Sequence, residues 1–123
     1  MQYTIRMLKK KIASFGYAFK GLRIGFREEM NFQIQIAFGV AAIFLGVFFQ
    51  ITTAEWLFII SVSGLVLTAE LLNTALEELC DMLEPSHDPH VGKIKDLAAA
   101  AVLVASATAL LVGILIFLPK FFS

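Results

Sequence analysis

Residues 56–83 read WLFIISVSGLVLTAELLNTALEELCDML, an apolar run that meets its first charge at Glu70. At about 1.5 Å per helical residue, Glu70 lies roughly 21 Å along a helix from Trp56, still within a hydrocarbon core of about 30 Å. Ionisable groups at that depth are costly and usually mark a functional site. The helix face that carries Glu70 also carries three later polar residues within an arc of roughly 80°: Asn73, Glu77 and Asp81. The stretch predicts a membrane helix whose polar stripe begins in lipid and runs out into water.

The composition of the whole chain indicates an integral membrane protein. Of its 123 residues, 59% are hydrophobic, which is more than a soluble domain of this size needs. The single cysteine, Cys80, excludes an internal disulfide and a cysteine-based metal cluster. The first residues lack the continuous apolar core and the cleavage site of a signal peptide.

The charges are unevenly distributed, although the formal net charge is +0. Most of the ten Lys and Arg residues precede residue 33: Arg6, Lys9, Lys10, Lys11, Lys20, Arg23 and Arg27. The 50–55 connection holds none of them, whereas the 77–96 connection holds Lys93 and Lys95. By the positive-inside rule, we expect a multi-pass protein of the inner (plasma) membrane whose N-terminus and 77–96 loop are cytoplasmic. Beside membrane spans, the basic residues favour anionic lipid headgroups over a nucleic-acid partner.

We predict an all-α membrane fold with two parts. Residues 1–31 form an amphipathic helix on the cytoplasmic surface, because apolar residues recur there at helical steps: Ile5, Leu8, Ile12, Phe15, Phe19, Leu22 and Phe26. The glycines at 16, 21 and 25 are expected to permit bends in it. Residues 32–123 form a three-helix transmembrane domain, with spans at about 32–49, 56–76 and 97–118.

Short connections separate the predicted spans. Residues 50–55 form the first turn, and the second helix continues past the membrane to about Leu83. Two prolines and a glycine then break the chain between Glu84 and Gly92. Pro119 is expected to close the third span.

Small residues recur at helical spacing on two of the spans. The first span carries Gly39, Ala42 and Gly46, and the third carries Ala101, Ala105, Ala109 and Gly113. Such stripes let helices approach one another closely in lipid. Because three short helices enclose a site poorly, we expect a homo-oligomer with sites between its subunits.

Three polar clusters converge at the predicted cytoplasmic interface. They are the stripe that begins at Glu70, the pair Glu28-Glu29 before the first span, and the pair Lys95-Asp96 before the third. Carboxylates can hold Mg²⁺ together with phosphate oxygens, lysines can neutralise polyphosphate charge, and one carboxylate can take a proton from an attacking hydroxyl. The clusters therefore indicate phosphate chemistry or ion handling. A solvated helix end accounts equally well for the charges near Asp81, and a structural contact between helices is the alternative for Glu70.

The segment AELLNTALEELCD, residues 69–81, resembles the signature helix of the bacterial diacylglycerol kinase family, which includes the undecaprenol kinases. The similarity extends in the same order to residues 16–23 (GYAFKGLR), 28–32 (EEMNF) and 92–103 (GKIKDLAAAAVL). It therefore covers nearly the whole chain. The resemblance implies a small homotrimeric membrane enzyme that transfers the γ-phosphate of ATP, bound with Mg²⁺, to the hydroxyl of a membrane lipid.

The resemblance also implies roles for individual residues. Glu70 is the expected catalytic base, and Asn73 is the expected amide of the active site. Glu29 and Glu77 are the expected Mg²⁺ ligands. The expected ATP contacts are Lys10, Tyr17, Glu29, Glu77, Asp81, Lys95 and Asp96. The expected lipid contacts are Ser14, Phe19, Arg23, Asn31, Gln35 and Glu70.

The chain departs from the family pattern at three places. Lys10 stands where the family often has Arg, so a two-pronged phosphate contact becomes a point charge. Phe19 replaces a frequent Trp and lacks its indole N–H. The loop at 86–88 differs from that of better-known members.

Two interpretations other than a kinase remain. A small ion- or proton-conducting membrane oligomer would use Glu70 as a relay, but it has no use for Glu29 or Lys95. An assembly protein would tolerate the loss of all these polar residues. If the chain is a kinase, its acceptor is either diacylglycerol or undecaprenol, and the residues favour neither.

Overall fold

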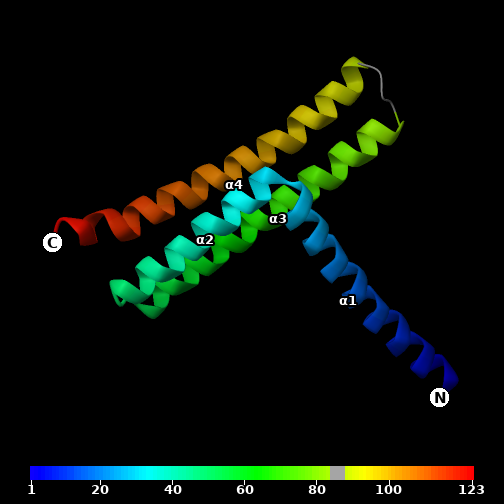
Figure 1. Ribbon diagram of the computed structural model, residues 1–123, viewed down its shortest axis with the longest axis horizontal. Helices are drawn as coiled ribbons and strands as arrows, with labels where there is room; N and C mark the ends of the chain where they lie inside the picture. Colours follow the sequence, from blue (N-terminus) through cyan, green and yellow to red (C-terminus); the bar gives the residue numbers. More distant parts are fainter. Residues whose placement is uncertain (84–87) are drawn as a thin grey trace.

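The structure is a computed structural model that describes residues 1–83 and 88–123. The helices of this part of the chain are α1 (Gln2–Glu28), α2 (Met30–Phe48), α3 (Thr53–Leu83) and α4 (Pro89–Phe121), and no strand occurs in it. In Figure 1, α2, α3 and α4 run alongside one another, whereas α1 leaves them at an angle and carries the N-terminus away. The prediction of an all-α fold is confirmed.

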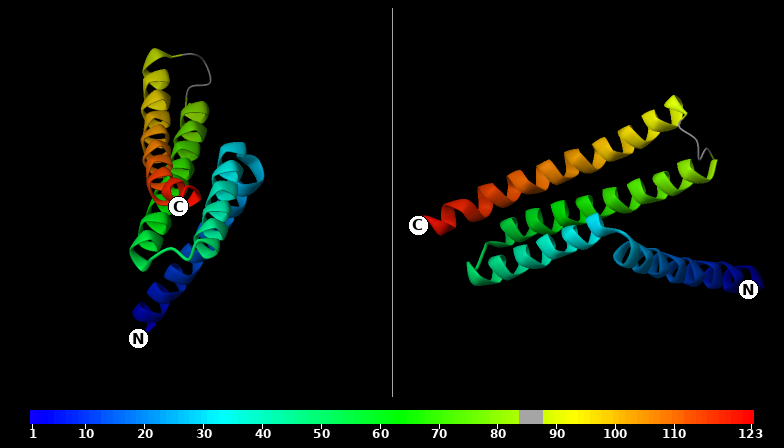
Figure 2. Two further views of the ribbon diagram at one scale, coloured as in Figure 1. Left: turned by 90° about the vertical axis from the view of Figure 1, so that its left-hand side faces the viewer. Right: turned by 45° about the horizontal axis from the view of Figure 1, so that its top comes forward.

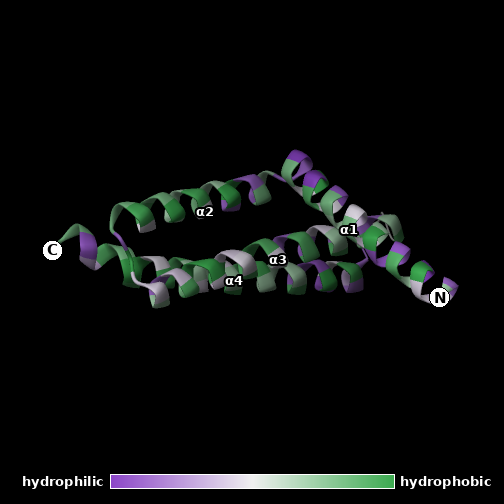
Figure 3. Ribbon diagram, turned by 90° about the horizontal axis from the view of Figure 1, so that it is seen from below, coloured by the Kyte–Doolittle hydropathy of each residue, from purple (hydrophilic) through white to green (hydrophobic). Residues whose placement is uncertain are grey.

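Three helices are long and apolar enough to cross a membrane: α2 with 19 residues, α3 with 31 and α4 with 33. About 20 residues span a hydrocarbon core, so α3 and α4 are long enough to extend beyond it. Hydrophilic residues lie mainly along α1 and at the ends of the other helices, while apolar residues fill their middle parts (Figure 3). The predicted spans at about 56–76 and 97–118 fall within α3 and α4, and the one at about 32–49 ends one residue beyond α2.

The helices α3 and α4 are antiparallel and contact each other along much of their length, while α2 packs against the first part of α3 (Figure 2). The buried core is small and lies where the α2–α3 turn meets the last part of α4. Its members are Ile51, Ile59, Ile116 and Phe117. Most other large apolar side chains are exposed. Such surfaces are normally covered by lipid or by another chain.

The junction of α1 and α2 is a single residue. Glu29 has an extended backbone (φ −111°, ψ 109°), so the chain turns there and a new helix starts at Met30. A Cβ atom at Gly25 would lie 3.0 Å from the Leu71 side chain and 3.6 Å from Phe32. The glycine therefore lets the end of α1 approach α3 closely. The glycines do not interrupt α1, which runs as one helix through all three of them.

The α2–α3 turn is shorter than the predicted 50–55 connection, because α3 begins at Thr53. Thr52 and Glu55 explain the early start: the Thr52 N–H donates to Glu55 Oε1 (3.0 Å), and the Glu55 N–H donates to Thr52 Oγ1 (3.2 Å). This reciprocal pair is a capping box, which satisfies backbone donors at a helix start. Gln50 takes a positive φ of 50°, which is unusual for a residue with a side chain.

The third predicted span, about 97–118, lies inside α4, but the expected helix break before it and the expected helix end after it were wrong. The expected break ran to Gly92, but α4 begins at Pro89, because Asp88 caps it by accepting the His90 N–H (2.7 Å) and proline is well suited to a first turn. At the other end α4 continues through Pro119 to Phe121. Residues 84–87, which hold the first part of the predicted break and part of the 86–88 loop, lie outside the described residues.

Candidate active site

Glu70 is the one buried charged side chain in the described part of the protein, with only 4% of its surface exposed. It follows Ile59 and Val66 on α3 at steps of seven and four residues, and both of these are buried as well. Helical periodicity places all three on one face, so the apolar packing face of α3 ends in a carboxylate.

Two further carboxylates, Glu29 and Glu77, lie close enough for their charges to act on Glu70. Glu77 is two helical turns further along α3. Glu29 comes from the α1–α2 junction, which the contact of Gly25 with Leu71 holds against α3. The structure thus brings together the predicted base and both predicted metal ligands.

Asn73 links this group through its carboxamide. Its Nδ2 donates to Glu77 Oε1 (3.3 Å), which orients that carboxylate. Its Oδ1 is buried and has no hydrogen-bond partner among the described residues. A buried acceptor without a donor costs free energy, so this oxygen marks a place where a donor or a cation would be favourable.

Lys95 and Asp81 form an ion pair between α4 and α3. Both had been predicted to contact ATP, and their pairing fixes Lys95 on the same end of the bundle as Glu77. Asp96, the neighbour predicted with Lys95, is exposed.

The predicted site residues of α1 are not brought to the carboxylates. There are five of them, and along this helix Ser14 Oγ donates to the carbonyl of Lys10 (3.0 Å) and the Lys20 ammonium sits 5.9 Å from the centre of the Tyr17 ring. Along α1, exposed side chains include Lys10, Ser14, Tyr17, Phe19 and Arg23. Asn31, near the start of α2, is exposed too. Figure 1 shows that α1, which carries the first five of these residues, points away from the other helices.

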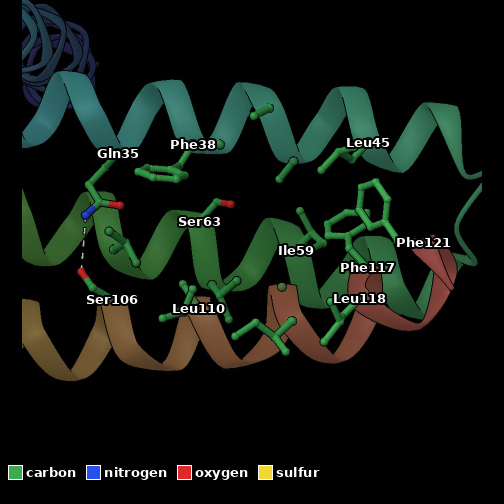
Figure 4. A pocket seen from close by; sticks show the side chains of 18 residues that line it. Gln35, Phe38, Leu45, Ile59, Ser63, Ser106, Leu110, Phe117, Leu118 and Phe121 are labelled. Atoms are coloured by element: carbon green, nitrogen blue, oxygen red, sulfur yellow. Dashed lines mark hydrogen bonds between the residues drawn. The ribbon is translucent and has the colours of Figure 1, made fainter.

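An apolar groove of about 500 Å³ runs between α2, α3 and α4. At one end Gln35 Nε2 donates to Ser106 Oγ (3.5 Å), and Ser63 lies nearby; at the other end Phe117 and Phe121 close in (Figure 4). On α3 the groove is lined by residues 59, 63 and 66. Residues 70, 73 and 77 continue the same helix face in steps of three and four. The groove and the carboxylates therefore share one face of α3.

Three residues with cross-helix contacts were not among the predicted site residues: Ser106, Glu55 and Lys120. The hydrogen bond between Gln35 and Ser106 joins residues 71 positions apart, so no local sequence pattern predicts it. Glu55 pairs with Lys120 (2.8 Å) at the other end of the bundle. The sequence does hold one signal for Glu55, since Thr52-x-x-Glu55 is the pattern of a capping box.

Comparison with known proteins decides the family. A family model described as prokaryotic diacylglycerol kinase matches residues 16–117. The chain belongs to this family. The match includes the α1–α2 junction, all of α3 and α4 as far as Phe117.

Individual members of the prokaryotic diacylglycerol kinase family are similar over most of the chain. An undecaprenol kinase of Bacillus subtilis (strain 168) is 36% identical over 113 residues, which cover 92% of each protein. A diacylglycerol kinase of Synechocystis sp. is also 36% identical over 113 residues, covering 91% of this chain and 65% of the relative. The diacylglycerol kinase of Escherichia coli (strain K12) is 29% identical over 100 residues, covering 81% of this chain and 82% of the relative.

The carboxylates suit the Mg²⁺ that a kinase of this family implies. Residues 1–83 and 88–123 hold no group of three or more His, Cys, Asp or Glu side chains arranged for a metal. Magnesium is usually bound by only one or two carboxylates together with phosphate and water oxygens. Glu29 and Glu77 both act on Glu70, and Asn73, which is hydrogen-bonded to Glu77, has an Oδ1 without a partner among the described residues, so the chemistry of these side chains fits that smaller requirement. Together, the family and the three apolar helices identify a multi-pass membrane protein of a lipid kinase family.

Proposed function

We propose that this protein transfers the γ-phosphate of ATP to the hydroxyl of a membrane lipid, either diacylglycerol or undecaprenol. The observation that carries the proposal is Glu70, a buried carboxylate flanked by Glu29 and Glu77 in a chain of the diacylglycerol kinase family. Its relatives are named for both acceptors, so the proposal leaves the choice between them to experiment.

Glu70 is the proposed base. The apolar face of α3 excludes water around it, so its carboxylate is poised to accept a proton from a lipid hydroxyl rather than from solvent. In phosphoryl transfer with a loose transition state, that proton can move late, and positioning of the hydroxyl is the main contribution.

Glu29 and Glu77 are the proposed ligands of the Mg²⁺ that accompanies ATP. When bound, this cation would neutralise phosphate charge during transfer. Asn73 orients Glu77 by its hydrogen bond. Lys95, held by Asp81, provides a positive charge for the polyphosphate.

The groove between α2, α3 and α4 is the proposed seat of the lipid chain. It lies at membrane depth on the face of α3 that leads to Glu70, so a chain lying in it would bring its hydroxyl to the base. From Ile59 to Glu70 the helix rises roughly 16 Å. This is about half the thickness of a 30 Å hydrocarbon core, so the groove has about the length of the lipid chains in one leaflet. Gln35, predicted to contact lipid, lines this groove.

The nucleotide side of the site is proposed to need a second subunit. The helix α1, which carries Lys10, Tyr17 and the residues predicted to contact lipid, leads away from the other helices, and these side chains are exposed, so they would serve the site of a neighbouring chain. We therefore propose a homotrimer with sites between subunits. The amphipathic segment 1–31 would lie on the cytoplasmic surface of the inner (plasma) membrane, and the N-terminus and the 77–96 loop would be cytoplasmic, where ATP is available.

A proton-conducting oligomer is the competing function, because a buried intramembrane carboxylate also suits a relay. The Glu29→Gln variant separates the two. In proteoliposomes with Mg-ATP and lipid alcohol, a kinase loses at least about tenfold in lipid phosphorylation when a metal ligand is removed, whereas a relay keeps its proton flux. Proton flux that survives in this variant, with no lipid phosphorylation by the wild type, would overturn the kinase proposal.

A further inference from the structure

An ion pair far from the carboxylates joins the start of α3 to the end of α4. Lys120 Nζ lies 2.8 Å from Glu55 Oε2, and about a quarter of each side chain is exposed. Nothing in the proposed phosphate transfer uses either residue. Glu55 precedes Glu70 by fifteen residues, or roughly 22 Å of helix.

Both carboxylate oxygens of Glu55 are engaged. Oε1 accepts the Thr52 N–H in the capping box, and Oε2 accepts from Lys120. The cap ties the Glu55 side chain to the backbone at the start of α3, so the position of Lys120 is fixed relative to that helix. Lys120 follows Pro119, which has no backbone N–H and leaves the last turn of α4 one hydrogen bond short. The side-chain ion pair is therefore one restraint on this turn, beside the burial of Phe117 and the packing of Phe121.

The pair adjoins the far end of the groove. Ile59 lies one turn after Glu55 on α3, and Phe117 lies nearly one turn before Lys120 on α4; both line the groove, as does Phe121. The Phe121 ring packs edge-on against Phe49, with centroids 5.0 Å apart. Figure 4 shows Ile59, Phe117 and Phe121 gathered at the end opposite Gln35. These rings form the end wall of the groove.

We propose that Glu55 and Lys120 are positioning residues for the far end of the acceptor's hydrocarbon chain. By holding the last turn of α4 on α3, they set the place of Phe117 and Phe121 and thus the contacts open to the last methylenes of a chain that begins at Glu70. This inference rests on the proposed kinase function and on the chain lying in the groove. If it holds, the length of the acceptor's hydrocarbon chain is recognised by residues that lie far from the phosphate.

A purely structural role makes a different prediction. Partly exposed ion pairs contribute little to stability, so a structural pair could be lost with small effects that are equal for all acceptors. A positioning pair affects only acceptors whose chains reach the wall. Comparing a short with a long acceptor therefore separates the two roles.

The test uses the full-length protein in mixed micelles with saturating Mg-ATP. KM is measured for a long and a short form of whichever acceptor the wild type phosphorylates: dioleoylglycerol and dioctanoylglycerol, or undecaprenol and farnesol. Lys120→Met keeps the apolar stem but removes the charge, and Lys120→Arg is the matched control that keeps the pair. Glu55→Gln, which keeps an acceptor for the helix cap, probes the same pair from α3 and serves if Lys120→Met does not accumulate.

The expected result is that Lys120→Met raises the ratio of long-chain to short-chain KM by about tenfold, the order of one lost methylene contact in an apolar pocket, and that Lys120→Arg leaves the ratio near the wild-type value. Glu55→Gln should shift the ratio in the same direction. A ratio unchanged in both neutral variants overturns the inference while leaving the kinase intact. Failure of the wild type to phosphorylate any of the four lipids overturns the proposed function itself.

Discussion

At the scale of single residues, the chemistry depends on where one carboxylate lies. Glu70 is buried at the end of the apolar face of α3, whereas Glu78 on the same helix is exposed. Two carboxylates eight residues apart therefore have different environments, and only Glu70 shares a face with the groove. Burial beside a lipid path, rather than acidity alone, distinguishes the proposed base.

Replacing Glu70 by Gln keeps the shape of the side chain and its hydrogen bonding but removes its capacity to accept a proton. We expect turnover to fall by about 10²–10⁴-fold, the usual contribution of a general base, with little change in the KM for ATP. The measurement is the steady-state rate of lipid phosphorylation by purified protein. Glu78→Gln is the control and should remain close to wild type. A Glu70→Gln protein that keeps more than a tenth of the turnover would rule out Glu70 as the base.

Part of the candidate site was predictable from local spacing and part was not. Glu70, Asn73 and Glu77 lie on one helix, so periodicity alone placed them on one face. The approach of Glu29 to them depends on the close contact of Gly25 with Leu71, which no local pattern reveals. The residues of α1 remain apart from this group in the single chain, so their predicted contacts with ATP and lipid stay predictions.

At the scale of helices, the most constrained contact joins α2 to α3. A Cβ atom at Gly46 would lie 2.6 Å from the Trp56 ring and 3.1 Å from Ile51, so no larger residue fits without movement. This contact holds the α2–α3 turn in place next to the buried core. The stripe of small residues predicted on the first span therefore has one member that is sterically required.

Gly46→Ala should destabilise the folded protein by about 1–3 kcal/mol, the usual cost of overpacking. The measurement is the midpoint of thermal unfolding in detergent, which we expect to fall. Gly64→Ala is the matched control, because a Cβ atom there meets nothing within 4 Å and the helix should be unharmed or slightly more stable. Equal midpoints for the two variants would mean that α2 and α3 do not approach as described.

Helix boundaries show where sequence patterns stop being sufficient. The end of α3 at Leu83 agrees with the prediction that the second helix continues to about that residue. The start of α4 was missed because proline was taken only as a breaker, whereas Asp88 caps a helix in which Pro89 occupies the first turn. At Pro119 the helix continues for two more residues, and Lys120 in that last turn pairs with Glu55. Long-range pairs of this kind cannot be read from local propensity.

At the scale of the whole molecule, the proposal requires one orientation in the membrane. ATP is cytoplasmic, so the ends of α3 and α4 near Asp81 and Lys95 must face the cytoplasm. The many basic residues before α2 favour a cytoplasmic N-terminus. The α2–α3 turn has no Lys or Arg, which favours its placement on the opposite side of the membrane.

Cysteine labelling checks this orientation. After Cys80→Ser, single cysteines are placed at Thr53, His90 and Ser123, which are all exposed. In intact spheroplasts, an impermeant thiol reagent should label positions 53 and 123 and spare position 90, and inside-out vesicles should reverse the pattern. Labelling of position 90 from outside, with position 53 protected, would place the carboxylates away from ATP.

The account as a whole rests on transfer of phosphate from ATP to a lipid, and this can be measured directly. Purified protein in lipid micelles is given Mg²⁺ and ATP labelled in its γ-phosphate, with diacylglycerol and undecaprenol offered separately, and the extracted lipids are separated by chromatography. We predict a labelled lipid phosphate from at least one acceptor, dependent on Mg²⁺ and lost in Glu70→Gln. If neither lipid becomes labelled while the protein remains folded, the account is contradicted.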